Sequence, residues 1–161
     1  MTKVVCPGSF NPVTLGHINV FERCARLFDE VVVLVVHNAA KTYHVSAQQR
    51  AEWIKRAVAH LPNVSVDAYS GLLVDYAASC GANLLVKGVR DALDVVVETQ
   101  MYYANREASK GSIDTMFLPT GEQFAYLSSS IVRDVASYGG DIGAFVPAAI
   151  LEEVAAAYRK R

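Results

Sequence analysis

Residues 30–36 read EVVVLVV, a nearly continuous apolar run in which five of the seven side chains are valine. Side chains alternate between the two faces of a strand, so a run of this kind must be buried on both faces. Such strands are typical of parallel sheets that helices cover on both sides. Shorter apolar runs lie at residues 3–6, 64–69, 83–86 and 115–118. The sequence therefore predicts a parallel sheet of five strands.

Helical patterns separate these apolar runs. In residues 15–28, apolar side chains recur at spacings of three and four, which places them on one stripe of a helix. Ser46 followed by Gln49 is typical of a helix N-terminus, and Pro147 suits the first turn of the last helix. Other helices are predicted at residues 71–79, 91–106 and 128–137. Strands that alternate with helices imply right-handed crossovers and one α/β domain over residues 1–161.

Composition narrows the classes of function. The chain has 161 residues, of which 52% are hydrophobic and 19% charged, so it can bury a core. The formal net charge is −1. Proteins that bind nucleic acid usually carry a strong excess of basic residues, so this charge argues against that function. Three cysteines without C-x-x-C spacing favour a reducing compartment over disulfides or a zinc site. No apolar run approaches the roughly 18 residues of a membrane helix, so we expect a cytoplasmic protein that acts on small molecules.

Cationic, hydroxyl and glycine residues follow the predicted strands. In open parallel sheets, ligands bind in the crevice at the carboxyl ends of the strands. The segments that follow the five strands are residues 7–17, 37–41, 69–73, 87–90, and 119–121 with 128–130. Because these segments meet at one edge of the sheet, they suit a polyanionic ligand, most simply a nucleotide phosphate.

The segment after the first strand, PGSFNPVTLGH at residues 7–17, has the features of an anion site. Gly8 allows the backbone to approach a phosphate closely, and Ser9 offers a hydroxyl and a backbone N–H. Thr14 is a candidate N-cap, and the helix beyond it presents free N–H groups. His17 lies in the first turn and can face the same anion. A plain strand-to-helix turn would need only a glycine and a cap, so the whole combination favours a functional site.

Several nucleotide-binding and hydrolytic motifs are missing from the chain. It has no G-x-x-x-x-G-K-[ST] sequence, which argues against a P-loop enzyme. It has no G-x-G-x-x-G after the first strand, which removes the main support for a dinucleotide redox role. A G-x-S-x-G nucleophile elbow is missing too. The phosphate site is therefore expected to be of a different type.

The segment at residues 7–17 resembles the (H/T)-x-G-H signature of the nucleotidyltransferase superfamily. Within it, the chain is similar to the bacterial phosphopantetheine adenylyltransferases. KGVR at residues 87–90 resembles their RGLR, and LSSSIVRDVA at residues 127–136 resembles their ISSSLVKEVA-like segment. The resemblance implies a Rossmann-like fold and transfer of an adenylyl group from ATP to 4′-phosphopantetheine, giving dephospho-coenzyme A and pyrophosphate. It also implies magnesium as cofactor and a homohexamer.

The resemblance further implies a set of site residues. Those for catalysis are His17, Ser9, Lys41 and Arg90. Those for ATP are Ser9, Phe10, His17, Gly88, Val89, Arg90, Glu98, Phe124, Ala125, Tyr126, Leu127, Ser128, Ser129 and Ser130. Those for the acceptor are Ser9, Lys41, Leu73 and Lys87.

The expected roles of these residues follow from the charges of the two substrates. We expect His17 and Ser9 to donate to the transferring α-phosphate. Lys41 and Lys87 would hold the acceptor phosphate, while Arg90 and the serines at 128–130 hold the β- and γ-phosphates. Magnesium would bind mainly to the phosphates, because the sequence has no clustered carboxylates at the site and predicts no protein ligand for it.

The chain departs from the family pattern at several positions. Asn11 stands where aspartate is usual, and Lys87 replaces a more frequent arginine. Residues 95–97 read VVV where aromatic and acidic residues are usual, and Phe124 stands where a larger aromatic is common. Two alternatives stay open: another nucleotidyltransferase, acting on nicotinate mononucleotide or an alcohol phosphate, and a non-catalytic nucleotide sensor or flavodoxin-like module.

Overall fold

The computed structural model describes residues 1–37 and 42–160. Its strands are β1 (Lys3–Gly8), β2 (Glu30–Val36), β3 (Val64–Tyr69), β4 (Leu84–Val89) and β5 (Asp114–Pro119). Its α-helices are α1 (Leu15–Leu27), α2 (Ala47–Ala57), α3 (Leu73–Ser79), α4 (Ala92–Ala108), α5 (Ser129–Ser137) and α6 (Leu151–Tyr158). Short 3-10 turns at Glu122–Phe124 and Ala148–Ile150 precede the last two helices. None of the helices in these described ranges is both long and apolar enough to cross a membrane.

Within the described residues, the strands form one sheet in the order β3-β2-β1-β4-β5 with every pair parallel. The predicted parallel five-stranded sheet and Rossmann-like α/β fold are therefore confirmed. From β1 the chain builds outward through β2 and β3, and it then returns to add β4 and β5 on the other side. This reversal places a topological switch point at the carboxyl ends of β1 and β4, where ligands bind in such sheets.

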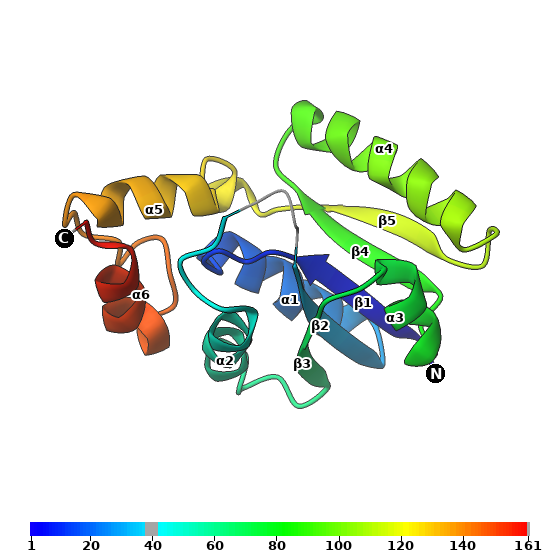
Figure 1. The fold of residues 1–161 in the computed structure, drawn as a ribbon. Helices are drawn as coiled ribbons and strands as arrows, with labels where there is room; N and C mark the ends of the chain where they lie inside the picture. Colours follow the sequence, from blue (N-terminus) through cyan, green and yellow to red (C-terminus); the bar gives the residue numbers. More distant parts are fainter. Residues whose placement is uncertain (38–41, 161) are drawn as a thin grey trace.

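The apolar run of β2 divides between two cores. Val31, Val33 and Val35 belong to the larger cluster, which also takes side chains from α1, α2, α5 and α6. Val32 and Leu34 belong to a smaller cluster with side chains from α3. Successive β2 residues thus face opposite layers of helices, as the continuous run predicted. Figure 1 shows α2, α5 and α6 gathered at one end of the molecule and α4 at the other.

The sheet edges are less buried than the sequence predicted. In β3, which reads VSVDAY, the polar residues Ser65 and Asp67 are exposed and the other four residues are partly buried. β4 continues to Val89, so Lys87 and Gly88 lie inside the strand and not after it. Of the described residues, none in α4 is buried. The predicted continuous burial therefore holds for the central strands and fails at the edge.

The helix ends follow the expected local chemistry. The Ser46 hydroxyl accepts a hydrogen bond from the Gln49 N–H at the start of α2, at 3.1 Å. Gly81 has a φ of 76° after α3, a left-handed conformation that glycine adopts without strain. Pro147 does not begin α6 directly, because the 3-10 turn at Ala148–Ile150 comes between them.

Candidate active site

A cleft of about 1170 Å³ opens at the carboxyl ends of β1 and β4. Its lining comes from the loop after β1, the first turn of α1, strand β4, one side of α4 and the N-terminus of α5. Pockets for one small ligand commonly have volumes of roughly 300–1,000 Å³. The cleft therefore has room for two substrates, and it lies at the edge of the sheet that the sequence predicted.

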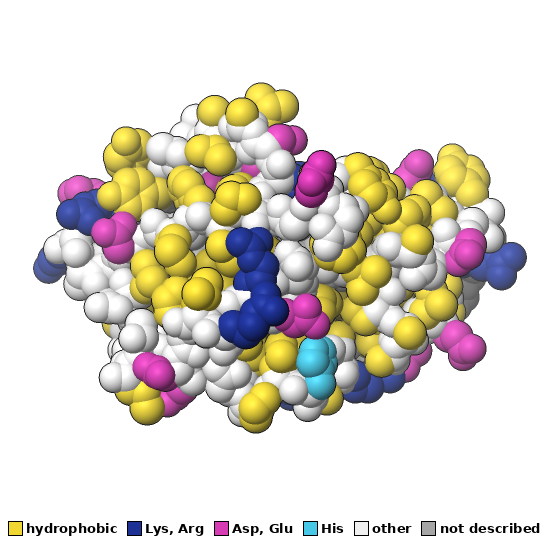
Figure 2. Space-filling view, turned by 180° about the vertical axis from the view of Figure 1, so that it is seen from behind, with side chains coloured by type: hydrophobic (Ala, Val, Ile, Leu, Met, Phe, Trp, Pro, Cys, Tyr) yellow, Lys and Arg dark blue, Asp and Glu magenta, His cyan; other side chains and the backbone are white. Residues whose placement is uncertain are grey.

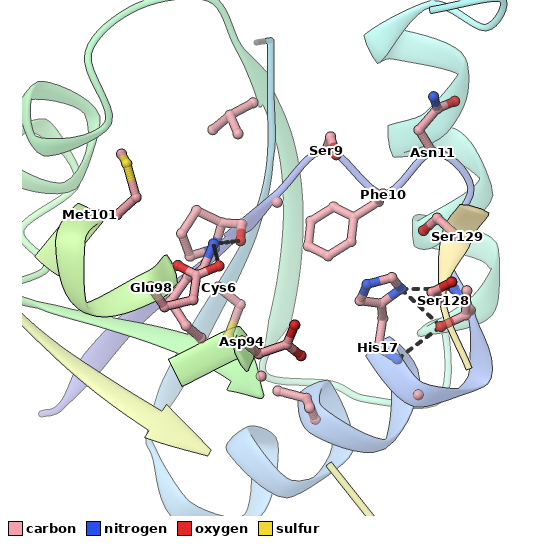
Figure 3. Close-up of a pocket in the computed structure, with 18 of the residues that line it drawn as sticks. Cys6, Ser9, Phe10, Asn11, His17, Asp94, Glu98, Met101, Ser128 and Ser129 are labelled. Atoms are coloured by element: carbon pink, nitrogen blue, oxygen red, sulfur yellow. Dashed lines mark hydrogen bonds and ion pairs between the residues drawn. The ribbon is translucent and has the colours of Figure 1, made fainter. Parts of the chain in front are cut away.

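The loop after β1 turns sharply and sends Phe10 inward. A Cβ atom at Gly8 would lie only 2.7 Å from the Phe10 ring, so this position requires glycine. The Phe10 ring packs edge-on against His17 and Phe21, with centroid distances of 5.1 and 5.4 Å. Figure 3 shows Phe10 directed toward His17 on the floor of the cleft. The ring thus supports the histidine from one side.

Hydrogen bonds at the N-terminus of α1 determine the tautomer of His17. The backbone N–H of Thr14 donates to Nδ1 of His17 at 3.0 Å, and the Thr14 hydroxyl accepts from the His17 N–H at 3.4 Å. In neutral histidine, the ring nitrogen that accepts a hydrogen bond carries no proton. The proton is therefore on Nε2, which can donate to an anion in the cleft.

The charge of His17 is set by its surroundings. Burial, together with the positive charges of Arg90 and Lys87, lowers the pKa of His17 from its ordinary 6.5 to about 4. The ring is therefore neutral near pH 7. A neutral ring with a proton on Nε2 is a hydrogen-bond donor and cannot also accept a proton at that atom.

We expect the His17 ring to titrate near pH 4 in the free protein. The folded pKa lies below the unfolded value, so the unfolded chain binds a proton first as pH falls, and stability is lost between about pH 6.5 and 4. Histidine NMR titration measures the midpoint directly. Pyrophosphate in the cleft should raise it, because an anion favours the charged ring. A midpoint at 6.5 or above in the free protein would contradict this electrostatic account.

Two cations of the cleft, Lys87 and Arg90, are paired with acids of α4. Lys87 lies 3.1 Å from a Glu98 carboxylate oxygen. Arg90 donates to both oxygens of Asp94 through Nε and Nη2, each at 2.9 Å. These hydrogen bonds lower the pKa of Asp94 below its usual range. Before substrate binds, the carboxylates therefore neutralise charges that would otherwise repel one another.

The Arg90–Asp94 pair leaves donors for a ligand. A guanidinium has five N–H groups, and Asp94 takes two of them. One further contact runs from Nη1 of Arg90 to the carbonyl of Leu127 at 3.4 Å. The carboxylate therefore holds the guanidinium in place while other N–H groups can reach phosphate. The sequence signal for Asp94 was its spacing four residues after Arg90, but no role was predicted for it.

The N-terminus of α5 forms another wall of the cleft. The Ser128 hydroxyl caps the helix by accepting from the Ile131 N–H at 3.2 Å. The Ser129 hydroxyl donates to the Pro12 carbonyl at 2.7 Å. Both serines line the same cleft as His17, and all three are labelled in Figure 3. Because a helix N-terminus presents backbone N–H groups and positive partial charge, this wall suits phosphate.

Most of the predicted site residues meet at this cleft. Those that line it are Ser9, Phe10, His17, Leu73, Lys87, Gly88, Arg90, Glu98, Leu127, Ser128, Ser129 and Ser130. Four other described residues, Val89, Phe124, Ala125 and Tyr126, are not part of the lining, and their contact with ATP stays a prediction. Lys41 lies outside the described residues.

Metal-binding groups are sparse at the site. Across residues 1–37 and 42–160, His, Cys, Asp and Glu side chains form no cluster of three or more that could hold a metal ion. The two carboxylates in the cleft, Asp94 and Glu98, are engaged with Arg90 and Lys87. The described part of the cleft therefore offers no cluster of free carboxylates, and the binding of magnesium stays a prediction.

Comparisons with known proteins show that the chain is similar to one family and to named members of it. The cytidylyltransferase-like family model matches residues 5–135. A phosphopantetheine adenylyltransferase from Herpetosiphon aurantiacus is 46% identical over 159 residues, which cover 99% of this chain and 96% of that protein. A phosphopantetheine adenylyltransferase from Corynebacterium efficiens is 42% identical over 160 residues, which cover 99% of each chain.

Proposed function

The chain belongs to the cytidylyltransferase-like family and, within it, to the phosphopantetheine adenylyltransferases, and from this membership we propose how its cleft transfers an adenylyl group. It is a nucleotidyltransferase of coenzyme A biosynthesis. ATP and 4′-phosphopantetheine are its substrates, and dephospho-coenzyme A and pyrophosphate are its products. The observation that carries this assignment is the similarity over 99% of the chain to two proteins of that name.

The reaction is an in-line displacement at the α-phosphorus of ATP. An oxygen of the acceptor phosphate forms the new bond, and the bond to the β-phosphate oxygen breaks with release of pyrophosphate. A phosphate dianion is already nucleophilic, so no general base is required. The protein has to align two anions that repel each other and to stabilise charge in the transition state. Hydrogen-bond donors and cations serve this task, and such groups line the cleft.

His17 and Ser9 stabilise the transferring phosphate. Nε2 of His17 carries a proton and the ring is neutral, because Thr14 donates to Nδ1, and burial together with nearby cations lowers the pKa of the ring. His17 therefore acts as a donor to the α-phosphate oxygen and not as a base. The Ser9 hydroxyl is a second donor, on a residue that lines the same cleft. Fixed donors of this kind need no reorganisation as charge develops.

The remaining groups divide between the two substrates. Lys87, with Lys41, holds the acceptor phosphate, and Leu73 lies along the pantetheine arm. Arg90 and the N-terminus of α5 hold the β- and γ-phosphates, through the guanidinium fork and through helix N–H groups. Lys87 lies inside β4 and Arg90 directly follows that strand. Their different positions support assigning the two cations to different substrates.

Magnesium is the cofactor in this proposal, bound to the phosphates of ATP. Bound there, the ion would neutralise part of the charge on the β- and γ-oxygens. The support is the engagement of Asp94 and Glu98 with Arg90 and Lys87, which leaves the phosphates as the available oxygen ligands. The chain's own part is to hold the triphosphate between Arg90 and α5.

We further propose that the protein forms a homohexamer in the cytoplasm. Helix α4 carries exposed apolar side chains that a partner subunit could cover: Leu93, Val95, Val96, Val97 and Met101. Figure 2 shows hydrophobic side chains at the surface along the edge where α4 runs. Large exposed apolar patches commonly mark interaction sites. The VVV departure at residues 95–97 falls on this surface.

The acceptor is identified by a direct assay. With ATP, magnesium and 4′-phosphopantetheine, the purified protein should release pyrophosphate and form a product with the mass of dephospho-coenzyme A. Parallel reactions with nicotinate mononucleotide and glycerol 3-phosphate should give none. Product with one of those acceptors only would make the chain a transferase of another specificity. ATP binding without any product would favour a nucleotide sensor, and a flavin-binding protein would purify yellow.

A further inference from the structure

The loop that carries Ser9 is held by donors from distant parts of the chain. The Ser9 carbonyl accepts from Arg50 of α2, whose side chain is only 1% exposed. The Asn11 carbonyl accepts from Arg133 of α5. The Pro12 carbonyl accepts from Ser129 at 2.7 Å. Because all three carbonyls accept hydrogen bonds from other elements, the loop cannot rotate without breaking several partly buried hydrogen bonds.

The loop needs this support because its backbone is strained. Phe10 has a φ of 44°, in the left-handed region that bulky side chains rarely adopt. Such residues persist where the surrounding contacts over-determine the conformation, and they are common at active sites. Phe10 also packs against His17. The strained residue therefore lies between the two groups that would donate to the α-phosphate, Ser9 and His17.

Tyr158, at the end of α6, makes the longest-range contact to this loop. Its hydroxyl donates to the side-chain oxygen of Asn11. The ring is 7% exposed and packs beside Trp53, with centroids 6.4 Å apart. Burial raises the pKa of Tyr158 to about 12, so the hydroxyl keeps its proton over the working pH range. Asn11 lies at the margin of the cleft, and Figure 3 shows its side chain pointing away from His17.

We propose that Tyr158 is a positioning residue for adenylyl transfer, which acts through its hydrogen bond to Asn11 to hold the loop of Ser9 and Phe10 in its strained conformation. Tyr158 does not line the cleft, so its effect on the reaction passes through the loop. Asn11 serves as a hydrogen-bond acceptor for Tyr158, and this role needs no carboxylate. The inference rests on the proposed function, because its readout is the transfer reaction.

The test is a double-mutant cycle in kcat. Tyr158→Phe removes only the hydroxyl, and Asn11→Ala removes the acceptor. Each single variant should lower kcat by about 10-fold, because small displacements of reacting groups are costly, while KM for ATP changes by less than about 2-fold. If both act through one hydrogen bond, the double variant should also lose about 10-fold and not about 100-fold. Tyr138→Phe, at an exposed tyrosine, is the control with unchanged kcat.

Three results would overturn the proposal: an unchanged kcat in Tyr158→Phe, an additive loss of about 100-fold in the double variant, or a loss that appears in KM alone. Thermal unfolding of each variant, with kcat measured well below its Tm, separates a positioning effect from a smaller folded fraction. The wild-type protein and Tyr138→Phe also test the proposed function. If they are inactive with 4′-phosphopantetheine, the proposed function fails, whereas active controls beside an unaffected Tyr158→Phe reject only this inference.

Discussion

His17→Ala is expected to lower kcat by about 10²–10³, the usual effect of losing one preorganised donor at a developing charge. Thr14 donates to Nδ1 at 3.0 Å, which places the ring proton on Nε2. A neutral ring at pH 7 follows from the pKa of about 4. KM for ATP should change much less than kcat, because the donor acts mainly on the transition state. Steady-state kinetics with both substrates varied measures the two effects.

The matched control for this variant is His60→Ala. His60 is half exposed and lies 3.1 Å from a Glu22 carboxylate oxygen, outside the residues that line the cleft. The His60→Ala variant should retain the kcat of the wild-type protein. His17→Ala also loses one half of the capping box of α1, a change of about 1 kcal/mol in unfolding free energy, so thermal unfolding should show a modest fall in Tm. Wild-type turnover in His17→Ala would refute the role assigned to this histidine.

Arg90→Ala is expected to lower kcat/KM for ATP by about 100-fold, or about 2.7 kcal/mol of transition-state stabilisation. The variant loses the guanidinium N–H groups that Asp94 leaves available to phosphate. It also leaves the Asp94 carboxylate in the cleft without its partner, where it repels the triphosphate. Both effects weaken ATP binding in the ground state and in the transition state, so KM should rise as well.

A second substitution separates these two causes. In Arg90→Ala/Asp94→Asn, the repulsive charge is gone while the donors are still missing, so part of the lost kcat/KM should return, by several-fold. Arg56→Ala is the matched control, because Arg56 also pairs with a carboxylate, Glu153 at 2.6 Å, but lies away from the cleft. An Arg90→Ala enzyme with unchanged kcat/KM for ATP would remove Arg90 from the phosphate site.

The sheet could be predicted because a strand that is buried on both faces has a continuous run of apolar residues in the sequence. In β2, consecutive valines face two different cores, and no polar residue interrupts the run. At the edge of the sheet the same argument failed, since β3 alternates between exposed and partly buried residues. The exposed residues of β3 are the polar Ser65 and Asp67, so the alternation was present in the sequence VSVDAY, and interpreting it as a continuous apolar run was wrong.

The site could be predicted where its residues are close in sequence. Thr14 and His17 are three residues apart at the start of α1, and Ser128 is the N-cap of α5. Local sequence patterns are therefore enough to predict these helix starts. The pairing of Lys87 with Glu98 was not predicted, because it depends on how α4 lies against β4. The roles of Val89 and Phe124 came from the family resemblance; neither lines the described cleft, and their contact with ATP stays a prediction.

By itself, the sequence determined the parallel sheet, the strand-to-helix loop at its carboxyl edge and the kinds of groups that line the cleft there. These follow from periodicity, capping and residue type, which act over a few neighbouring residues. The tertiary structure alone decided that Arg50 binds the Ser9 carbonyl and that Tyr158 binds the Asn11 side chain, from 41 and 147 residues away. Hydrogen bonds between distant segments exist only once packing has brought them together, so no local pattern records them.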